Sequence, residues 1–389
     1  FHERATGHGS VNLDSWSMPP GLLDALMRET ATDADLVVVE GVMGLFDGIA
    51  GSPGRTGATA DLASRFGLPV ILVIDVTSQA QSAAALLRGF ATHDPAVKIA
   101  GVVLNRVASD RHAKLVSRAI DALRIPILGR LPRNSTVTLP ERHLGLVQAG
   151  EHEDLDNRFA ALADMAETHL DLDAILALAR PAQTIGGAVS GRLPPPGSRI
   201  AVAEDRAFTF LYPHLAHAWR EQGATLVPFS PLADEGPDPT CDACWLPGGY
   251  PELHAGTLAS ANRFKAELAS FAQSRPVHGE CGGYMVLGDG LADGDGTRHA
   301  MAGLLSHATS FADRKLHLGY RQARLLEPSV LGDVGTDVRG HEFHYAHVIE
   351  PGHDAPLASL ADGEGQPLGT AGGRRGNVTG TFFHAIAAG

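Results

Sequence analysis

The sequence has few cysteines, few basic residues and no long apolar run. Only 3 of its 389 residues are cysteine, too few for a disulfide framework, so we expect a reducing compartment, the cytoplasm. Lys and Arg number 31 against 44 Asp and Glu, a net charge of -13, which disfavours nucleic acid and anionic membrane surfaces as partners. No apolar run approaches the roughly 20 residues that a membrane-spanning helix needs.

A phosphate-binding loop is also missing. The pattern Gly-x-x-x-x-Gly-Lys-[Ser/Thr], whose backbone N–H groups cradle nucleotide phosphates, occurs nowhere in the chain. The sequence opens at Phe1 with neither an initiator Met nor a signal pattern. We therefore expect the loop on a preceding segment of roughly 40 to 50 residues, the first βα unit of a parallel sheet.

Short apolar runs alternate with amphipathic stretches through the first half. Near-continuous Val, Ile and Leu runs predict strands buried on both faces, and so a parallel sheet covered by helices. Glu40, Asp75 and Asn105 each end such a run, which would bring them to one edge of the sheet. The predicted strands are 36–40, 69–75, 99–105 and 126–131, and the predicted helices are 59–66, 79–90, 111–123 and 155–179.

A stretch over 183–198, rich in Gly and Pro, has neither helical nor alternating periodicity and predicts a linker. Beyond it, strands are predicted at 199–204, 224–228 and 242–246, with an amphipathic helix at 208–222. The length fits two domains. We predict two α/β domains in series, 1–182 and 199–389.

Cys281 lies in the sequence Gly-Glu-Cys-Gly-Gly, between an apolar strand and a helix. Flanking glycines permit the strained turn of a nucleophile elbow, and a helix N-terminus lowers a thiol pKa. A buried, inert cysteine is the commoner case, but glycines on both sides disfavour it. The Gly-Gly turn within 245–252 has free N–H groups that, together with the N–H of Gly282, could bind a developing oxyanion. His384 and the cluster at 340–345 compete as the base.

These motifs resemble the class I glutamine amidotransferase family in its cobalamin-pathway branch. The resemblance implies that Cys281 attacks the glutamine amide, that His384 is its base, and that Gly249 and Gly282 donate to the oxyanion. The standard triad has a Glu two residues after the histidine, where this chain has Ile386. That absence is typical of the branch and implies a weakly activated or conditionally assembled glutaminase.

Glu40 and Asp47 stand at the two ends of a Gly-rich loop that leaves a predicted strand. Hard oxygen ligands at this place suit Mg²⁺ on nucleotide phosphates. A turn aspartate and a surface glutamate are the equally weighted alternative. The parallel-sheet context favours the metal.

The motifs at 12–18, 40–48 and 101–106 resemble, in order, the P-loop amidoligase domain of the cobyrinic and hydrogenobyrinic acid a,c-diamide synthase family, which is similar to dethiobiotin synthetase. The resemblance spans the whole chain. It implies an α/β P-loop domain, and a ligase that activates the a and c acetate carboxylates of a corrinoid acid as acyl phosphates, with ATP, Mg²⁺ and glutamine. Asp75 and Asn105 would bind the nucleotide, although an Asn that caps a turn is commoner.

Three residues are candidates for binding the corrinoid. Asp14 and Trp16 would border its pocket, or simply form a packed loop, and Arg142 would meet its carboxylates, or be an ordinary surface arginine. A homodimer is the expected assembly. The competing functions are a non-catalytic amidotransferase-like regulator or scaffold, and another P-loop amidotransferase such as cobyric acid synthase, whose loop after the Glu differs.

Overall fold

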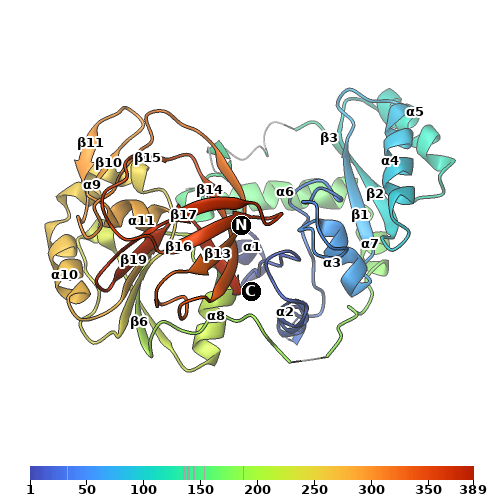
Figure 1. The fold of residues 1–389 in the computed structure, drawn as a ribbon. Helices are drawn as coiled ribbons and strands as arrows, with labels where there is room; N and C mark the ends of the chain where they lie inside the picture. Colours follow the sequence, from blue (N-terminus) through green and yellow to red (C-terminus); the bar gives the residue numbers. More distant parts are fainter. Residues whose placement is uncertain (33, 135–136, 138–140, 143–144, 153, 187) are drawn as a thin grey trace. The chain divides into compact units, whose positions relative to one another are not determined.

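The computed structural model describes residues 1–389 except 33, 135–136, 138–140, 143–144, 153 and 187. The chain divides into two compact units (Figure 1). Unit 1 comprises Phe1–Ser10 and Met27–Gly186, and unit 2 comprises Val11–Leu26 and Gly187–Gly389. The early segment Val11–Leu26 thus groups with the C-terminal half. The domain limits expected from the sequence, 1–182 and 199–389 around a linker at 183–198, remain a prediction.

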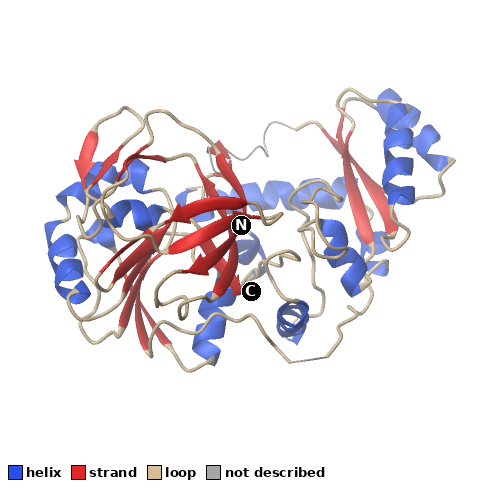
Figure 2. Ribbon diagram, viewed as in Figure 1, coloured by secondary structure: helices blue, strands red, loops and turns tan. Residues whose placement is uncertain are grey.

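Unit 1 is built on a parallel sheet with strand order β1-β2-β3 (Figure 2). Its buried core joins apolar side chains of the sheet to those of the helices, among them Leu87, Leu104 and Val116. The strands are β1 (Val70–Asp75), β2 (Ile99–Val107) and β3 (Ile127–Pro132), and the helices α3 (Thr59–Phe66), α4 (Ser82–His93) and α5 (Asp110–Asp121). The predicted α/β architecture with a parallel sheet is confirmed here.

The predicted strand at 36–40 is wrong. This stretch is a loop without strand pairing, in which Leu36 and Val38 are exposed, Val38 to 82%, while Val37 and Val39 are partly buried. An apolar run becomes a strand only when a neighbouring strand takes up its N–H and C=O groups, and the sheet β1-β2-β3 does not include it. Glu40 therefore does not end a strand.

The single helix predicted over 155–179 is also wrong, because two helices occupy this stretch. They are α6 (Leu155–His169) and α7 (Leu172–Ala177). Leu170 between them makes an antiparallel bridge to Gly129, and Asp171 caps α7 by accepting a hydrogen bond from the Ala174 N–H. The tertiary pairing and the new cap break the helical run. The remaining short elements are α1 (His2–Thr6), β4 (Glu141–Arg142) and β5 (Gly145–Leu146), while α2 (Pro20–Thr32) runs from unit 2 into unit 1.

Unit 2 has a central sheet with strand order β18-β19-β9-β8-β6-β7, parallel except at the edge strand β18. Its strands are β6 (Arg199–Ala203), β7 (Thr225–Phe229), β8 (Ala243–Leu246), β9 (Val277–Glu280), β18 (Gly373–Arg375) and β19 (Val378–Thr381). Its helices are α8 (Pro213–Glu221), α9 (Ala255–Ser260), α10 (Asn262–Ala272) and α11 (Gly282–Leu287). The strands predicted at 199–204, 224–228 and 242–246 are confirmed, and the helix predicted at 208–222 is shorter.

A second, antiparallel sheet of unit 2 has the strand order β17-β16-β13-β14-β20. One buried cluster ties it to the central sheet and to α8, with Trp219 and Trp245 packed edge to face. Its strands are β13 (His317–Leu325), β14 (Asp337–His344), β16 (Ala358–Asp362), β17 (Pro367–Ala371) and β20 (His384–Ala388). A small third sheet holds β10 (Gly290–Ala292), β11 (Arg298–Ala300), β12 (Ala308–Ser310) and β15 (His347–Glu350). Among the described residues, no helix is both long enough and apolar enough to cross a membrane.

Candidate active site

Cys281 forms the tight turn between β9 and α11. Its backbone is at φ 48° and ψ -103°, a region that side-chain-bearing residues avoid and that marks strained functional positions. The adjacent glycines are needed sterically, since a Cβ on Gly283 would collide with the Leu246 carbonyl and one on Gly279 would lie 2.7 Å from the Gly283 carbonyl carbon. The predicted strand-to-helix elbow is confirmed, with Cys281 only 2% exposed.

Gly248 shows how the histidine and the cysteine lie together. A Cβ built on Gly248 would be 2.5 Å from Cε1 of His384, 3.3 Å from its Nε2 and 3.4 Å from Cβ of Cys281. Both side chains therefore border the same glycine, and the Nε2 edge of the ring is on that side. The structure thus brings together the two residues predicted as nucleophile and base, from β20 and from the turn after β9.

The two predicted oxyanion donors are also neighbours. A Cβ on Gly282 would lie 3.0 Å from the backbone nitrogen of Gly249, and one on Gly249 would collide with the Ala207 carbonyl. The N–H of Gly282 already faces the Cys281 sulfur, where it lowers the thiol pKa. Within the part of the chain that the structure describes, the N–H of Gly249 donates no hydrogen bond. Two neighbouring N–H groups, one from the turn after β8 and one from the start of α11, match what an oxyanion requires.

Burial decides the protonation of this pair. It raises the pKa of Cys281 to about 12, against the lowering by the Gly282 N–H, so the expected lowering at the helix N-terminus does not prevail. Burial, followed by His341 and His344, holds the pKa of His384 well below its usual range. The resting pair is a neutral thiol beside a neutral imidazole, and a thiolate forms only when His384 takes its proton.

Glu280 is a site residue that the sequence reading did not identify. It is 1% exposed, one of its oxygens accepts a hydrogen bond from the Ala385 N–H at 2.9 Å, and the other lies 3.7 Å from Nδ1 of His384. Burial raises its pKa to about 8. The histidine's own strand carries no carboxylate two residues after His384, where Ile386 stands. The sequence signal that could have indicated Glu280 was its position directly before Cys281, at the end of a buried strand.

The competing histidine cluster at 340–345 lies beside His384. His341 of β14 is the register partner of His384, and their rings stack with centroids 5.3 Å apart. The Tyr212 hydroxyl is 3.1 Å from Nδ1 of His341, and burial lowers the His341 pKa to about 4. His341 is thus a neutral neighbour of His384, and it is His384 that borders Cys281 through Gly248.

Asp14 and Trp16 lie in the segment of unit 2 that precedes α2. One Asp14 oxygen accepts from the Trp16 and Ser17 N–H groups, and the other accepts from the Tyr320 hydroxyl at 2.8 Å. The Trp16 ring, 5% exposed, stacks on Tyr320 and lies under the Arg339 guanidinium. These contacts describe a packed segment, so corrinoid binding by either residue remains a prediction.

In unit 1, Asp75 ends β1, and its register partner Asn105 lies two residues before the end of the parallel strand β2. Hydrogen bonds from Thr77, then the Arg106 guanidinium 3.0 Å away, hold the pKa of Asp75 below its usual value. The Asn105 side-chain oxygen accepts from the Arg106 N–H. The expected shared sheet edge is therefore present for this pair, although it does not extend to Glu40.

Glu40 and Asp47 are both exposed in the loop that precedes α3. Glu40 lies 3.4 Å from the His2 ring, and the Asp47 carboxylate folds back on Gly44. Their oxygens suit Mg²⁺ by type, but no cluster of three or more metal-ligating groups among the described residues contains either. Arg142 lies in β4, and its side chain falls outside the part that the structure describes.

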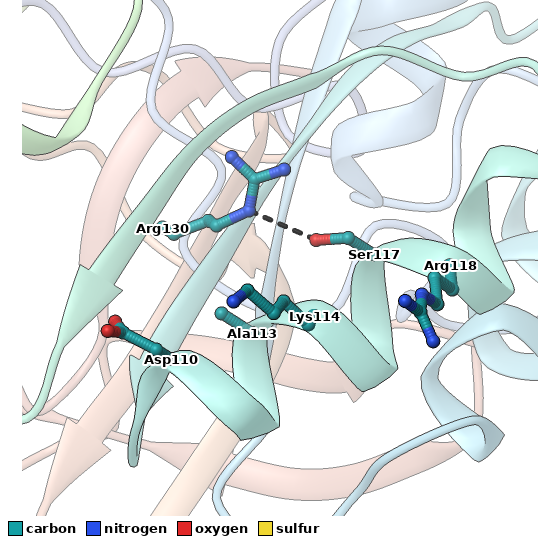
Figure 3. A pocket seen from close by; sticks show the side chains of 6 residues that line it. All are labelled: Asp110, Ala113, Lys114, Ser117, Arg118 and Arg130. Carbon is teal, nitrogen blue, oxygen red and sulfur yellow. Dashed lines mark hydrogen bonds between the residues drawn. The ribbon is translucent and has the colours of Figure 1, made fainter.

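A shallow hollow of about 310 Å³ lies on unit 1 between α5 and β3 (Figure 3). Three cationic side chains and one carboxylate border it, and Arg130 donates to the Ser117 hydroxyl at 3.0 Å. It contains none of the predicted site residues. Its lining residues are Asp110, Ala113, Lys114, Ser117, Arg118 and Arg130.

Comparison with known families matches both halves. Residues 199–389 match a CobB/CobQ-like glutamine amidotransferase domain, and residues 20–141 match an AAA domain. These matches confirm the predicted fold class, a P-loop domain followed by an amidotransferase-like domain.

Similar curated proteins extend over nearly the whole chain. A hydrogenobyrinate a,c-diamide synthase of Mesorhizobium japonicum is 61% identical, over 100% of this chain and 88% of its own length. Those of Agrobacterium fabrum and Rhodobacter capsulatus are 57% and 54% identical, over 100% of this chain and 89% and 88% of their own lengths. Among solved structures, a glutamine amidotransferase from Thermotoga maritima covers 48% of this chain and 76% of its own at 15% identity, with a TM-score of 0.33.

Proposed function

This chain belongs to the hydrogenobyrinate a,c-diamide synthase family, and from that premise we propose that it amidates the a and c acetate carboxylates of a corrinoid acid. Glutamine supplies the nitrogen and ATP the activation. The observation that carries the proposal is the buried elbow of unit 2, where Cys281, His384 and two backbone N–H groups converge. Members of such a family that had lost catalysis would have no need of this strained arrangement.

Ammonia is released at Cys281. His384 takes the thiol proton at Nε2, and the thiolate attacks the side-chain amide carbon of glutamine. The oxygen of the tetrahedral intermediate accepts hydrogen bonds from the N–H groups of Gly249 and Gly282. His384 then gives its proton to the departing nitrogen, which leaves as ammonia. Water, deprotonated by His384, cleaves the remaining thioester to glutamate and restores the thiol.

The acid is activated in unit 1. Direct attack of ammonia on a carboxylate fails because its oxygen is a poor leaving group. A carboxylate oxygen of the corrinoid therefore attacks the γ-phosphorus of ATP, ADP leaves, and an acyl phosphate forms. Ammonia attacks its carbonyl carbon and phosphate departs, which leaves the amide. Asp75 and Asn105, at the shared sheet edge, would hold the nucleotide.

Mg²⁺, when bound, would neutralise charge on the transferring phosphoryl group, and Glu40 and Asp47 are the residues that would hold it. Arg142, Asp14 and Trp16 are the proposed contacts to the corrinoid. We place the reaction in the cytoplasm, in agreement with the three free cysteines of the chain. The assembly that we propose is a homodimer.

The test is to incubate the full-length protein with ATP, Mg²⁺, glutamine and either cobyrinic or hydrogenobyrinic acid, and to follow product mass. We expect two successive carboxyl-to-amide conversions, with ADP and glutamate formed in step. Absence of amidation with both corrinoids would overturn the proposal. The comparison of the two acids also tells whether the substrate carries cobalt.

A further inference from the structure

We propose that Glu280 is the positioning residue of His384, in place of the carboxylate that the standard triad takes from two residues after its histidine. The inference rests on the proposed glutaminase reaction and adds to it the third member of the site. Glu280 directly precedes the nucleophile at the end of β9. The end of this strand therefore supplies both the carboxylate that orients His384 and the thiol that attacks the substrate.

The contacts of Glu280 fix the histidine at two points. One carboxylate oxygen accepts the backbone N–H of Ala385 at 2.9 Å and so holds the start of β20. The other lies 3.7 Å from Nδ1 of His384. With Nδ1 on the Glu280 side, Nε2 is left on the Gly248 side, next to Cys281. A base with this orientation has the correct nitrogen free for the thiol proton.

The backbone that carries Glu280 is rigid. Strand β9 lies between β19 and β8 in the central sheet, and Glu280 itself is the register partner of Thr381. Ile386 cannot replace the missing carboxylate, because its side chain is apolar and buried. Its backbone carbonyl oxygen lies 2.9 Å from the His214 ring. Among the described residues, Glu280 is the one carboxylate that the structure pairs with His384.

The chemistry needs such a partner. When His384 holds the thiol proton it is a buried cation, which burial disfavours strongly. A carboxylate at Nδ1 stabilises this cation far more in a water-excluded site than it would in water. At 3.7 Å the contact is longer than a hydrogen bond, and contacts of this kind tighten when substrate binds. Glu280 thus gives a physical basis for a glutaminase that is weakly active until its site is assembled.

Other ionisable groups also face this pair, and they belong to several elements. Glu252 and Glu342 act on the Cys281 thiol, His341 and His344 act on His384, and Tyr212 is influenced by Glu280. The removal of Glu280 alone therefore has to be separated from general changes in the electrostatics of the site.

The experiment compares Glu280→Gln and Glu280→Asp with the unmodified full-length protein. Initial rates of glutamate release and of amide formation are measured with glutamine and, separately, with ammonia. We expect Glu280→Gln to lower kcat with glutamine about 100-fold at unchanged KM, while ammonia-dependent amidation stays within about twofold. Glu280→Asp, which keeps the carboxylate on a shorter side chain, is expected to recover part of kcat. Asp354→Asn is the matched control, because it removes a buried unit 2 carboxylate whose partners are Ser306 and Arg375.

A pH profile gives the second readout. Because burial raises the pKa of Glu280 to about 8, kcat with glutamine should rise with pH up to that region as the carboxylate ionises. Glu280→Gln should lose this rise.

An unchanged kcat in Glu280→Gln overturns the assignment, and so does a loss of glutamine and ammonia activities together, which means a structural role. If Glu280→Gln fails to fold, the test rests on Glu280→Asp. The assignment of Glu280 is then overturned if this variant recovers no kcat with glutamine while its dependence of kcat on pH matches that of the unmodified protein. Failure of the unmodified protein to release glutamate overturns the proposed function itself.

Discussion

The candidate site residues of the two units differ in how the surrounding chain holds them. In unit 2, the turn after β9 is enclosed by strands and glycine contacts, and Glu280, Cys281 and His384 are all buried. In unit 1, the stretch at 36–48 is mostly exposed, with Glu40 beside the His2 ring and the Asp47 carboxylate folded back on Gly44. A catalytic group acquires a fixed geometry when paired strands hold it on both sides, and a Gly-rich loop alone does not supply that.

The largest expected effect separates the two units by reaction. Cys281→Ala removes the nucleophile and should lower glutamine-dependent glutamate release by 10³-fold or more, on the order of other nucleophile deletions. Amidation with free ammonia should continue, because the activation of the acid does not use the thiol. Rates with both nitrogen sources measure this. Loss of both would mean that Cys281 is structural and that the units are not separable in this way.

The second prediction tests the packing of the elbow. Gly248→Ala places a methyl group 2.5 Å from Cε1 of His384, so the ring must move, and we expect about a 10²-fold loss of kcat with glutamine. Gly256→Ala is the control, since its Cβ would meet nothing closer than 3.8 Å, from the His299 ring. Steady-state kinetics with thermal unfolding distinguish the two variants. Equal activities would show that His384 tolerates displacement.

The third prediction is a contribution of Glu280 to the pH dependence of stability. Burial raises the pKa of Glu280 to about 8, so the folded chain holds a proton that the unfolded chain has already lost. Stability from this group is fully present below the unfolded value near 4.5 and is lost as pH rises through 8. Between pH 6.5 and 8 we expect Glu280 to contribute a decrease of about 2 kcal/mol to the free energy of unfolding, while buried histidines with lowered pKa values, such as His341 and His384, contribute an increase that does not depend on Glu280.

Thermal unfolding across this pH range, compared between the unmodified protein and Glu280→Gln, measures that decrease. The free energy of unfolding of the variant should lack the decrease that Glu280 contributes. Asp75→Asn in unit 1 is the control, because Asp75 is an exposed residue and its substitution should leave the pH dependence as it is. A dependence that survives in Glu280→Gln would assign it to another group.

The smallest effect concerns the nucleotide. If Asn105 contacts ATP, Asn105→Ala should raise the KM for ATP about 10-fold, the cost of one lost hydrogen bond to a bound ligand. Glutamate release without ATP should not change. An unaltered KM for ATP would leave Asn105 as a residue of β2 whose side-chain oxygen accepts from the Arg106 N–H, and would weaken the case for nucleotide binding at this sheet edge.

What the sequence predicts well are features that local residues determine. Cys281 between glycines already specifies a strand, a strained turn and a helix, and the runs that became β1 and β2 needed only their own periodicity. Residues 36–40 have the same apolar character, but a strand also requires a partner, which a single run does not reveal. The break at Leu170 likewise comes from its bridge to Gly129, a contact across 41 positions that helical periodicity does not contain.

Two site residues escaped prediction for a related reason. The need for glycine at position 248 arises from the ring of His384, which the chain supplies 136 positions later. The role of Glu280 depends on the face of β20 that meets β9, which sequence spacing around the histidine does not give. Roles of this kind follow from the contacts between elements and become visible only in the folded chain.

The grouping of Val11–Leu26 with unit 2 sets an order of events during synthesis. Tyr320 and Arg339, which contact Asp14 and Trp16, are made about 300 residues after them. At the 5–20 residues per second of translation, the segment waits for tens of seconds, uncovered, until β13 and β14 exist. The fold of unit 2 is therefore completed only when this segment meets strands that are made about 300 residues after it.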